Sequence, residues 1–392
     1  MKSILNSAKK EATPPKKLQE KKMRIAKKAC DLIEQTIEKH PQIVGFELGG
    51  SYAKGTWLAE KADIDIFVKF NKKTSENNFA DLGTKIGFQS LKKYKPYTRY
   101  AEHPFVEAVI DGTKVNIVPC YDVNKGEWQS ATDRSIYHTK FMSKKLSNSM
   151  KEEVRILKKF FHHIGVYGAE IAKEGFSGYV SEVLISYFGS FEKTIKKISE
   201  LKKGQVIGKS GKKFDSYVVI IDPVDSNRNL GTAISVDNLG KFVLASRAFL
   251  KKPSKKFFKK PTSKRSMKNT DKIVVVQFGF KERSDDIIWG QIKRASNALK
   301  TQLELGGFSV LRNSAVKDES GNAALIFLLH AKKIENSLVR SGPEISSKEH
   351  CDKFISANLK KSQLMWVNDE GKMQSLQTVS YTHLTLPTIL LV

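Results

Sequence analysis

The sequence predicts an α+β protein with three main parts: a mixed sheet with helices, a central helical domain and a C-terminal α+β body. Three observations lead to this prediction. Apolar and polar residues alternate over 63–70, as they do in a strand. Apolar residues follow helical spacing over most of 147–203. From residue 273 onward, a strand, a helix and two more strands follow one another, an order typical of a small α+β sandwich.

The first part is predicted to span residues 17–140, after a frayed basic arm over 1–16. Pro41 ends its first helix, because the residue before a proline avoids helical geometry. Asp111-Gly112 is a favoured two-residue hairpin turn. The expected elements are a helix, two strands, a second helix and a hairpin, over 17–40, 43–48, 63–70, 80–94 and 105–119.

The remaining parts follow from composition and spacing. The central domain contains the helical stretch 147–203, a strand over 218–222 and a helix over 239–250. In the body, Ser284 is the expected N-cap of a helix that ends at Gly306-Gly307. The uncharged terminus is either a terminal strand or, as we favour, a foreign segment, because it resembles a translated sequencing adapter, and it is excluded from functional reasoning. The predicted central domain, body, truncated tail and foreign terminus span 141–255, 256–350, 351–374 and 375–392.

Composition excludes several protein classes. The 392 residues are 40% hydrophobic, which suits a globular chain of about two to four domains. No apolar run approaches the roughly 18 residues of a membrane span, and the basic N-terminus lacks the core of a secretory signal. Cys30, Cys120 and Cys351 are far apart and odd in number. We therefore expect no disulfide framework, no zinc site and a cytoplasmic location.

The charge favours a polyanionic partner. Lys and Arg number 68 against 41 Asp and Glu, a formal net charge of +27. Nucleic acid is the first candidate, because neutralised phosphates release counterions, although a lysine-rich proteome would give the same surplus. Segment 251–270 has nine basic residues, no acidic ones and two adjacent phenylalanines. It is either a solvated linker or a surface that follows phosphates.

The segment 49–70 carries the candidate chemistry. Asp63 and Asp65 are two residues apart on a predicted strand, so their carboxylates share a face. Neighbouring carboxylates repel unless a cation lies between them, and such hard oxygen ligands suit Mg²⁺, which also binds phosphates. A two-metal site of this kind can stabilise both the attacking and the leaving oxygen of a phosphoryl displacement.

The turn before this strand supplies an anion site. Glycines at 49 and 50 let the backbone approach a ligand, and Ser51 offers a hydroxyl and an N–H where a short helix begins. Lys54 adds a positive charge for phosphates. Each feature alone is usually structural. Together, with eleven residues between Ser51 and Asp63, they predict a loop for a triphosphate beside a strand for its metal.

This segment resembles the nucleotidyltransferase signature of the DNA polymerase β superfamily, in which Gly-Ser and a short gap precede Asp-x-Asp on a strand. Later motifs resemble, in order, those of the archaeal-type (class I) CCA-adding enzymes. The resemblance covers about residues 20–370. The motifs include YAEHPFVEAVIDGTKVNIVPCY (100–121), DRSIYHTKF (133–141), VRILKKF (154–160), GVYGAEI (165–171), GFSGYVSEVLI (175–185), DPVDSNRNL (222–230) and SRAFLKKPSKKFF (246–258).

The resemblance implies a polymerase-β-like catalytic domain and a tRNA nucleotidyltransferase. Such an enzyme adds C, C and A to tRNA 3′ ends from CTP and ATP, without a template and with Mg²⁺. The implied partner is the tRNA acceptor arm, and a homodimer is left open. By position, Asp63 and Asp65 would be the catalytic magnesium ligands. The implied nucleotide contacts are Ser51 and Lys54 to the phosphates, His138, Lys158 and Tyr167 in the pocket, and Arg228 to the base edge.

One position departs from the family. A third aspartate normally lies on the strand that matches KVNIVPC, and here the residue at this catalytic and metal position is Asn116. An asparagine offers a carbonyl oxygen but no charge, and it cannot accept a proton. We expect neither Glu107 nor Asp111 to replace it. A slower enzyme, an RNA-binding pseudoenzyme and a sequence error are the three explanations, and we favour an enzyme with compromised activity.

Two other functions remain open. A poly(A)- or oligoadenylate-type transferase shares the Gly-Ser and Asp-x-Asp motifs but lacks the later ones. A non-catalytic tRNA-binding protein would bind tRNA in a salt-sensitive way and incorporate no nucleotide. The predicted body has no obvious aromatic motif for reading RNA. We therefore expect recognition of the shape and phosphates of the acceptor arm.

Overall fold

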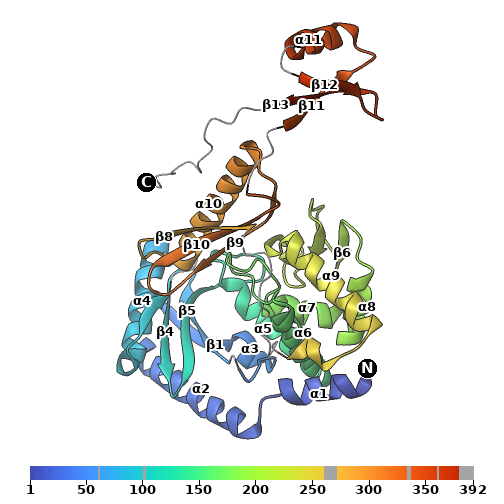
Figure 1. Cartoon of the computed structure of the whole chain (residues 1–392). Helices are drawn as coiled ribbons and strands as arrows, with labels where there is room; N and C mark the ends of the chain where they lie inside the picture. Colours follow the sequence, from blue (N-terminus) through green and yellow to red (C-terminus); the bar gives the residue numbers. More distant parts are fainter. Residues whose placement is uncertain (61, 100–102, 260–271, 333–336, 360–361, 379–392) are drawn as a thin grey trace. The chain divides into compact units, whose positions relative to one another are not determined.

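The computed structural model describes residues 1–392 except 61, 100–102, 260–271, 333–336, 360–361 and 379–392 (Figure 1). The chain divides into two compact units. The first comprises residues 1–266 and 281–291, and the second comprises 267–280 and 292–392. The elements combine a mixed sheet, a helical part and further β structure, so the predicted α+β class is confirmed.

A five-stranded mixed sheet, in the order β1-β2-β5-β4-β3, forms the N-terminal part of the first unit. Strands β2 and β5 are parallel, and every other neighbouring pair in this sheet is antiparallel. The predicted hairpin turn is confirmed, since Asp111 and Gly112 have φ angles of 48° and 74°. The strands are β1 (Ile43–Gly49), β2 (Ile64–Asn71), β3 (Tyr97–Arg99), β4 (Phe105–Ile110) and β5 (Thr113–Asp122).

Two helices pack on one face of this sheet and determine which side chains are left for the site. They are α2 (Lys16–Ile37) and α4 (Glu76–Leu91), which continues into η1 (Lys92–Tyr94). Ile64 and Ile66 of β2 are fully buried in the core that these helices share with the sheet. Because side chains alternate along a strand, Asp65 must project from the opposite face.

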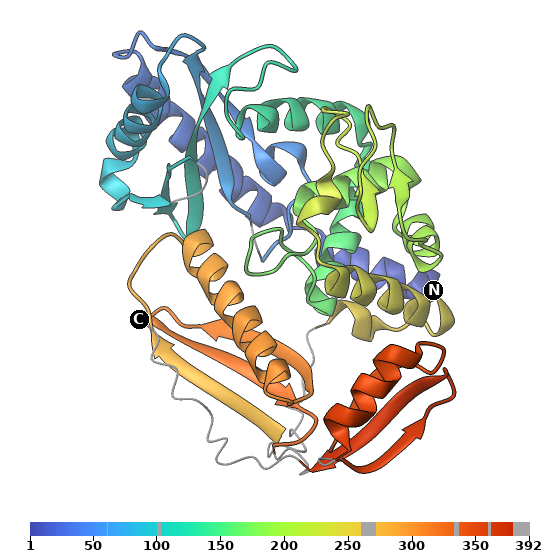
Figure 2. The same cartoon turned by 90° about the horizontal axis from the view of Figure 1, so that it is seen from above.

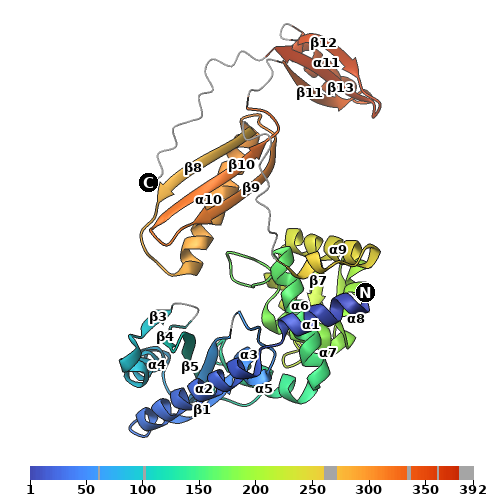
Figure 3. The ribbon, with the colours of Figure 1, turned by 60° about the horizontal axis from the view of Figure 1, so that its bottom comes forward.

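The N-terminal segment differs from the expected frayed arm. Helix α1 (Lys2–Ala12) packs against α6 (Asn148–Ile164), and Figure 3 shows the two helices side by side. Ala8 and Ala12 are almost completely buried there. The frayed conformation was a wrong prediction, because the apolar residues among the lysines fall on one helical face that another domain covers.

The helical part of the first unit is centred on aromatic side chains. It comprises α5 (Asp133–Lys145), α6, α7 (Gly178–Phe188), α8 (Phe191–Ser199), α9 (Val236–Lys251), the short strands β6 (Gln205–Ile207) and β7 (Val218–Ile220), and the 3₁₀ turns η2 (Leu230–Ala233) and η3 (Lys255–Phe258). Phe258 packs against Phe160, Phe191 and Phe249. The two adjacent phenylalanines of the basic stretch therefore pack with the helical core, whereas 260–270 lies outside the described residues.

In the second unit, β8 (Ile273–Gly279), β9 (Val310–Lys317) and β10 (Asn322–Leu329) form an antiparallel sheet in the order β8-β10-β9. Of helix α10 (Asp285–Leu305), residues 292–305 belong to this unit and lie along one face of its sheet (Figure 2). The Ser284 hydroxyl accepts a hydrogen bond from the Ile287 N–H, which confirms the predicted N-cap. The β-α-β-β order of the body is confirmed as well.

A second small sheet follows that the sequence patterns did not predict. It contains β11 (Ser337–Glu344), β12 (Ser362–Val367) and β13 (Lys372–Thr378) in the order β11-β13-β12, together with α11 (Lys348–Asn358). Residues 375–378 of the terminus that we set aside belong to β13, and 379–392 lie outside the described residues.

All three cysteines are free thiols. In the part of the chain that the structure describes, no helix is both long enough and apolar enough to cross a bilayer.

Candidate functional site

The two acidic residues of the predicted metal site lie at the start of β2. Asp63 is exposed just before the strand, and Asp65 is half-buried on it. In the parallel pairing of β2 with β5, Asp65 is the partner of Asn116. The Asn116 Nδ2 donates a hydrogen bond to the Asp65 Oδ1 over 2.8 Å. The three residues of the predicted site are therefore grouped at one end of the only parallel pair in this sheet.

Asp65 is an acid whose ionised form is disfavoured. Burial raises the pKa of the Asp65 carboxyl, the hydrogen bond from Asn116 opposes this rise, and the negative charge of Asp63 adds to it. A cation beside the pair would stabilise the ionised form of both carboxyl groups.

The oxygen atoms at this site suit a divalent metal, but their total negative charge is lower than in a site with three carboxylates, because the third residue is Asn116. Asn116 Oδ1 is buried and has no hydrogen-bond partner, so it is a free neutral oxygen close to the Asp65 carboxylate. Oxygen ligands of this type suit Mg²⁺. Within the described residues, no cluster of three or more His, Cys, Asp or Glu side chains could hold a metal, and the third position of this site is an amide. Of the two other acids nearby, Asp111 lies in the exposed turn, and Glu107 is the cross-strand partner of Asn116 on β4 and pairs with Lys114 at 2.8 Å.

Gly50 makes room for the Asp65 carboxylate. It begins the short helix α3 (Gly50–Lys54), which also contains Ser51, and its φ is 65°. A Cβ at this position would lie 1.9 Å from the Asp65 Oδ2. The second glycine of the turn is therefore required twice, for its backbone conformation and for its missing side chain.

Replacing Gly50 by alanine should destabilise the fold by more than the backbone alone explains. Gly165→Ala is the matched control, because Gly165 has a φ of 75° and open space around it. An alanine at positive φ costs roughly 1–2 kcal/mol at either position. Displacing the Asp65 carboxylate should add about 1 kcal/mol for Gly50→Ala, measured by urea unfolding. Equal losses in the two variants would show that Asp65 tolerates the methyl group.

Two adjoining cavities lie between the sheet and the helical part, and Asp65 lines the first of them. The first has a volume of about 580 Å³, and its walls include Gly50, Lys54 and Asp65. The second has a volume of about 490 Å³, and its walls include Arg228. The residues that line both cavities are Ala131, Ser135, His138 and Tyr179.

A buried charge cluster lies at the first cavity. The Glu182 carboxylate on α7 is 2.5 Å from the Lys54 Nζ and 3.4 Å from the Lys158 Nζ. It also accepts a 2.5 Å hydrogen bond from the Thr56 hydroxyl. Burial lowers the pKa of Lys158 to about 8, although Glu182 opposes this change. The resemblance implied a phosphate contact for Lys54 and a place in the nucleotide pocket for Lys158, and the structure pairs both ammonium groups with one carboxylate.

Tyr167 lies beside this cluster. Its ring stacks on His162 with centroids 4.0 Å apart. A Cβ placed on Gly178 would be 2.9 Å from the Tyr167 Oη and 3.3 Å from the Lys158 Nζ. The hydroxyl and the ammonium group therefore approach the same point at the start of α7.

A second buried carboxylate, Asp222, organises the other cavity. It is completely buried and accepts hydrogen bonds from His138 Nε2 at 2.8 Å, Tyr179 Oη at 2.9 Å and Arg228 Nη1 at 3.1 Å. Burial alone would raise the pKa of Asp222, but hydrogen bonds from His138 and from the Val224 N–H outweigh burial and hold it at about 2. Asp222 is therefore ionised, and it holds His138 and Arg228, two of the predicted nucleotide contacts, in place.

Comparison with protein families identifies three segments of the chain. A nucleotidyltransferase domain matches residues 29–141, and the second domain of tRNA nucleotidyltransferase matches 152–259. The C-terminal domain of the CCA-adding enzyme matches 269–382. The three matches follow the chain in the order of its structural parts.

Individual relatives extend over most of the chain. A CCA-adding enzyme of Saccharolobus shibatae is 35% identical over 355 residues, covering 90% of this chain and 84% of the relative. The chain belongs to the CCA-adding enzyme family. Further members are the CCA-adding enzymes of Sulfurisphaera tokodaii, at 35% identity over 86% of this chain and 81% of the relative, and of Methanothermobacter thermautotrophicus, at 32% over 84% and 75%. The predicted family and the predicted enzyme class, a tRNA nucleotidyltransferase, are confirmed.

Solved structures place this CCA-adding enzyme in a wider fold group. Escherichia coli MS115-1 CdnC in complex with HORMA-deltaN aligns with a TM-score of 0.50 at 16% identity, covering 66% of this chain and 93% of that chain. Cid1 in complex with the UTP analogue UMPNPP aligns with a TM-score of 0.50 at 11% identity, covering 66% and 99%. At these identities the likeness shows a shared fold alone.

Sequence reasoning missed three residues that organise the site of this CCA-adding enzyme. Glu182, Tyr179 and Asp222 lie in motifs that the family resemblance quoted but did not interpret. Tyr179 stacks on His138 with centroids 3.9 Å apart and lies 5.4 Å from the Lys54 Nζ, so it links the two clusters. One signal was available for Glu182: an acid followed by Val-Leu-Ile in a helix is out of place unless it has a partner.

Proposed function

We propose that the chain completes tRNA 3′ ends by adding C, C and A from CTP and ATP, with the site described above as its active centre. The observation that carries this proposal is a cavity whose walls include Asp65, Lys54 and His138, with Asp63 two residues before Asp65 at the start of the same strand. Acidic ligands for a divalent ion next to a basic, walled cavity match the needs of nucleotidyl transfer.

The incoming nucleotide would occupy the two adjoining cavities. The cluster of Lys54, Lys158 and Glu182 keeps one net positive charge when both lysines are protonated, and this charge would face the triphosphate. Ser51 would bind the same phosphates. Tyr167, whose hydroxyl approaches Lys158, would contact the ribose.

Arg228 and His138 would face the base. Asp222 binds one edge of the Arg228 guanidinium, and the arginine side chain is 44% exposed, so its remaining donors are available. A rigid guanidinium fork can meet acceptor atoms of either cytosine or adenine. The fixed orientation of Arg228 therefore supports recognition of both nucleotides by one pocket.

Nucleotidyltransferases generally use a divalent metal, and here Asp63, Asp65 and Asn116 Oδ1 would hold Mg²⁺. When bound, Mg²⁺ supplies positive charge that stabilises the oxygens of the reacting phosphate. Asn116 brings no charge and accepts no proton. The two aspartates therefore carry the whole negative charge of the ligand set, and only they can take a proton from the tRNA 3′ hydroxyl.

The partner would be the acceptor arm of tRNA. The net charge of +27 supports binding to its phosphates, with an affinity that falls as salt rises. A cytoplasmic location is supported by three thiols that remain unpaired.

The test is extension of a tRNA that lacks its 3′ end, with each nucleoside triphosphate supplied alone and in combination. Addition of C, C and A followed by a stop is the expected result. A run of A would support a poly(A)-type transferase instead. Tight, salt-sensitive binding without incorporation would support a non-catalytic tRNA-binding protein. That alternative has one structural argument, because Asn116 already donates a hydrogen bond to Asp65.

A further inference from the structure

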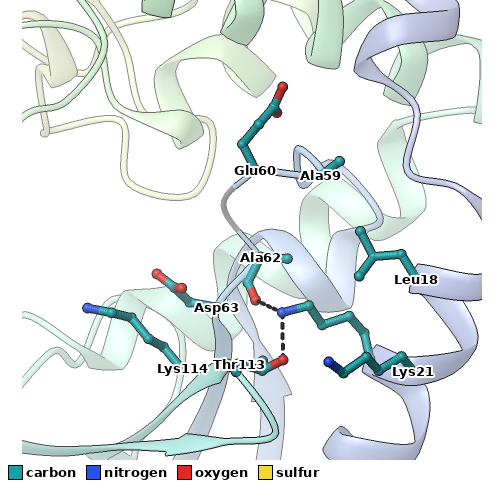
Figure 4. Close-up of a pocket in the computed structure, with 10 residues that line it drawn as sticks. Leu18, Lys21, Ala59, Glu60, Ala62, Asp63, Thr113 and Lys114 are labelled. Atoms are coloured by element: carbon teal, nitrogen blue, oxygen red, sulfur yellow. Dashed lines mark hydrogen bonds between the residues drawn. The ribbon is translucent and has the colours of Figure 1, made fainter.

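A cavity outside the nucleotide site borders Asp63 (Figure 4). Its volume is about 410 Å³, and its walls come from α2, from the segment that leads into β2 and from the turn between β4 and β5. Figure 4 shows two hydrogen bonds that meet at one nitrogen between Ala62 and Thr113. The lining residues are Leu18, Lys21, Lys22, Ala59, Glu60, Ala62, Asp63, Gly112, Thr113 and Lys114.

That nitrogen is the Nζ of Lys22, a lysine buried at the wall of the cavity. It donates to the Ala62 carbonyl oxygen over 2.7 Å and to the Thr113 Oγ1 over 2.8 Å. Only 7% of Lys22 is exposed. Lysines are almost never buried to this extent unless they are paired, because burying a polar group costs free energy. An apolar side chain would fill this position at lower cost if packing were its only role.

The two hydrogen-bond acceptors of Lys22 lie at equivalent positions beside β2 and β5, the strands of the metal site, because each is two residues before the first paired residue of its strand. Ala62 immediately precedes Asp63, and Thr113 is the first residue of β5. The parallel pairing of β2 with β5 begins only at Ile64 and Val115. Asp63 therefore lies just outside the paired region, where no hydrogen bonds between β2 and β5 hold it. Lys22 instead links its neighbour Ala62 to Thr113 of β5.

We propose that Lys22 is a positioning residue that sets the place of Asp63 relative to Asp65 and Asn116, and thereby the affinity of the chain for a divalent cation. This inference rests on the metal site of the proposed function. Its action is indirect, through the Ala62 carbonyl, so Lys22 itself contacts neither metal nor substrate.

Removing the Lys22 ammonium group has opposite expected effects on cation affinity, depending on whether its charge or its hydrogen bonds matter more. Removing a positive charge near the carboxylates should strengthen cation binding by simple electrostatics. Losing the bond to Ala62 should weaken it, because Asp63 is then free to move. Lys21→Met is the matched control: Lys21 is the next residue, lines the same cavity and is exposed. Methionine keeps most of the lysine length, so Lys22→Met leaves little empty space.

The experiment measures Mn²⁺ binding to the purified full chain by electron paramagnetic resonance, and the Mg²⁺ dependence of nucleotide incorporation. We expect Lys22→Met to weaken Mn²⁺ binding about fivefold and to raise the Mg²⁺ concentration for half-maximal rate by a similar factor, below the effect of groups bonded directly to metal ligands. Lys22→Arg should restore most of the affinity, and Lys21→Met should leave it unchanged or slightly tighter.

Thr113→Val removes only the second hydrogen bond and keeps the side-chain shape, so it tests the proposal even if Lys22→Met does not fold. We expect it to weaken Mn²⁺ binding about twofold. Wild-type affinity in folded Lys22→Met, or in Thr113→Val when only that variant folds, would overturn the positioning role while leaving the proposed function intact. A wild-type chain that binds no Mn²⁺ would overturn the metal site of the proposed function, and this inference with it.

Discussion

Replacing Asn116 by aspartate is expected to raise Mg²⁺-dependent nucleotide incorporation more than about tenfold, because the ligand set gains a negative charge and a proton acceptor. The Asn116 side chain already lies against Asp65, at 2.8 Å, so an aspartate would enter the site without rearrangement of β5. The measurement is the initial rate of tRNA extension with CTP across a range of Mg²⁺ concentrations.

The same variant has a signature that does not depend on activity. Burial and the charge of Asp63 already raise the pKa of Asp65, so a third carboxylate should destabilise the metal-free protein. Added Mg²⁺ should then raise the melting temperature of Asn116→Asp more than that of the wild type. Asn124→Asp places the same charge on an exposed residue and should change neither quantity. No gain in rate at any Mg²⁺ concentration would mean that the site works without a third acid.

Replacing Glu182 by alanine is expected to lower the free energy of unfolding by about 3–5 kcal/mol, the range for a buried ion pair that loses one partner. Glu182 is 1% exposed and is the shared partner of Lys54 and Lys158, so its removal leaves two ammonium groups without their carboxylate. The measurement is urea unfolding at pH 7. Glu349→Ala, which breaks an exposed pair with Lys353, should cost less than about 1 kcal/mol.

The loss caused by Glu182→Ala should also depend on pH. In the wild type, burial lowers the Lys158 pKa to about 8, and Glu182 counteracts this effect. Without Glu182, the folded-state pKa falls further, so the variant releases this proton at a lower pH while its unfolded state keeps it. The stability deficit should therefore shrink as the pH rises to about 8 and stay level above it. A deficit that grows with pH would contradict this account of the cluster.

Local patterns predicted most of the elements because their causes are local. The alternation of residues 63–70 and the turn at Asp111-Gly112 depend on neighbours in the chain, and both match the structure. The N-terminal helix was not predicted, because a helix this short is stable only where another element packs on its apolar face. Here α6, far along the sequence, covers Ala8 and Ala12. The sheet of β11, β12 and β13 was missed because its strands show no clear alternation of apolar and polar residues.

The candidate site likewise contains residues that local patterns predicted and residues that only the fold brings together. Asp63 and Asp65 could be read from the sequence by themselves, since a period of two along a strand already determines that they share a face. The tertiary structure alone decided that Lys54 meets Glu182, 128 residues away, and that Lys22 meets Thr113, 91 residues away. A buried charge needs a partner, but no spacing rule says which distant residue will provide it, because that choice depends on how elements far apart in the sequence pack together.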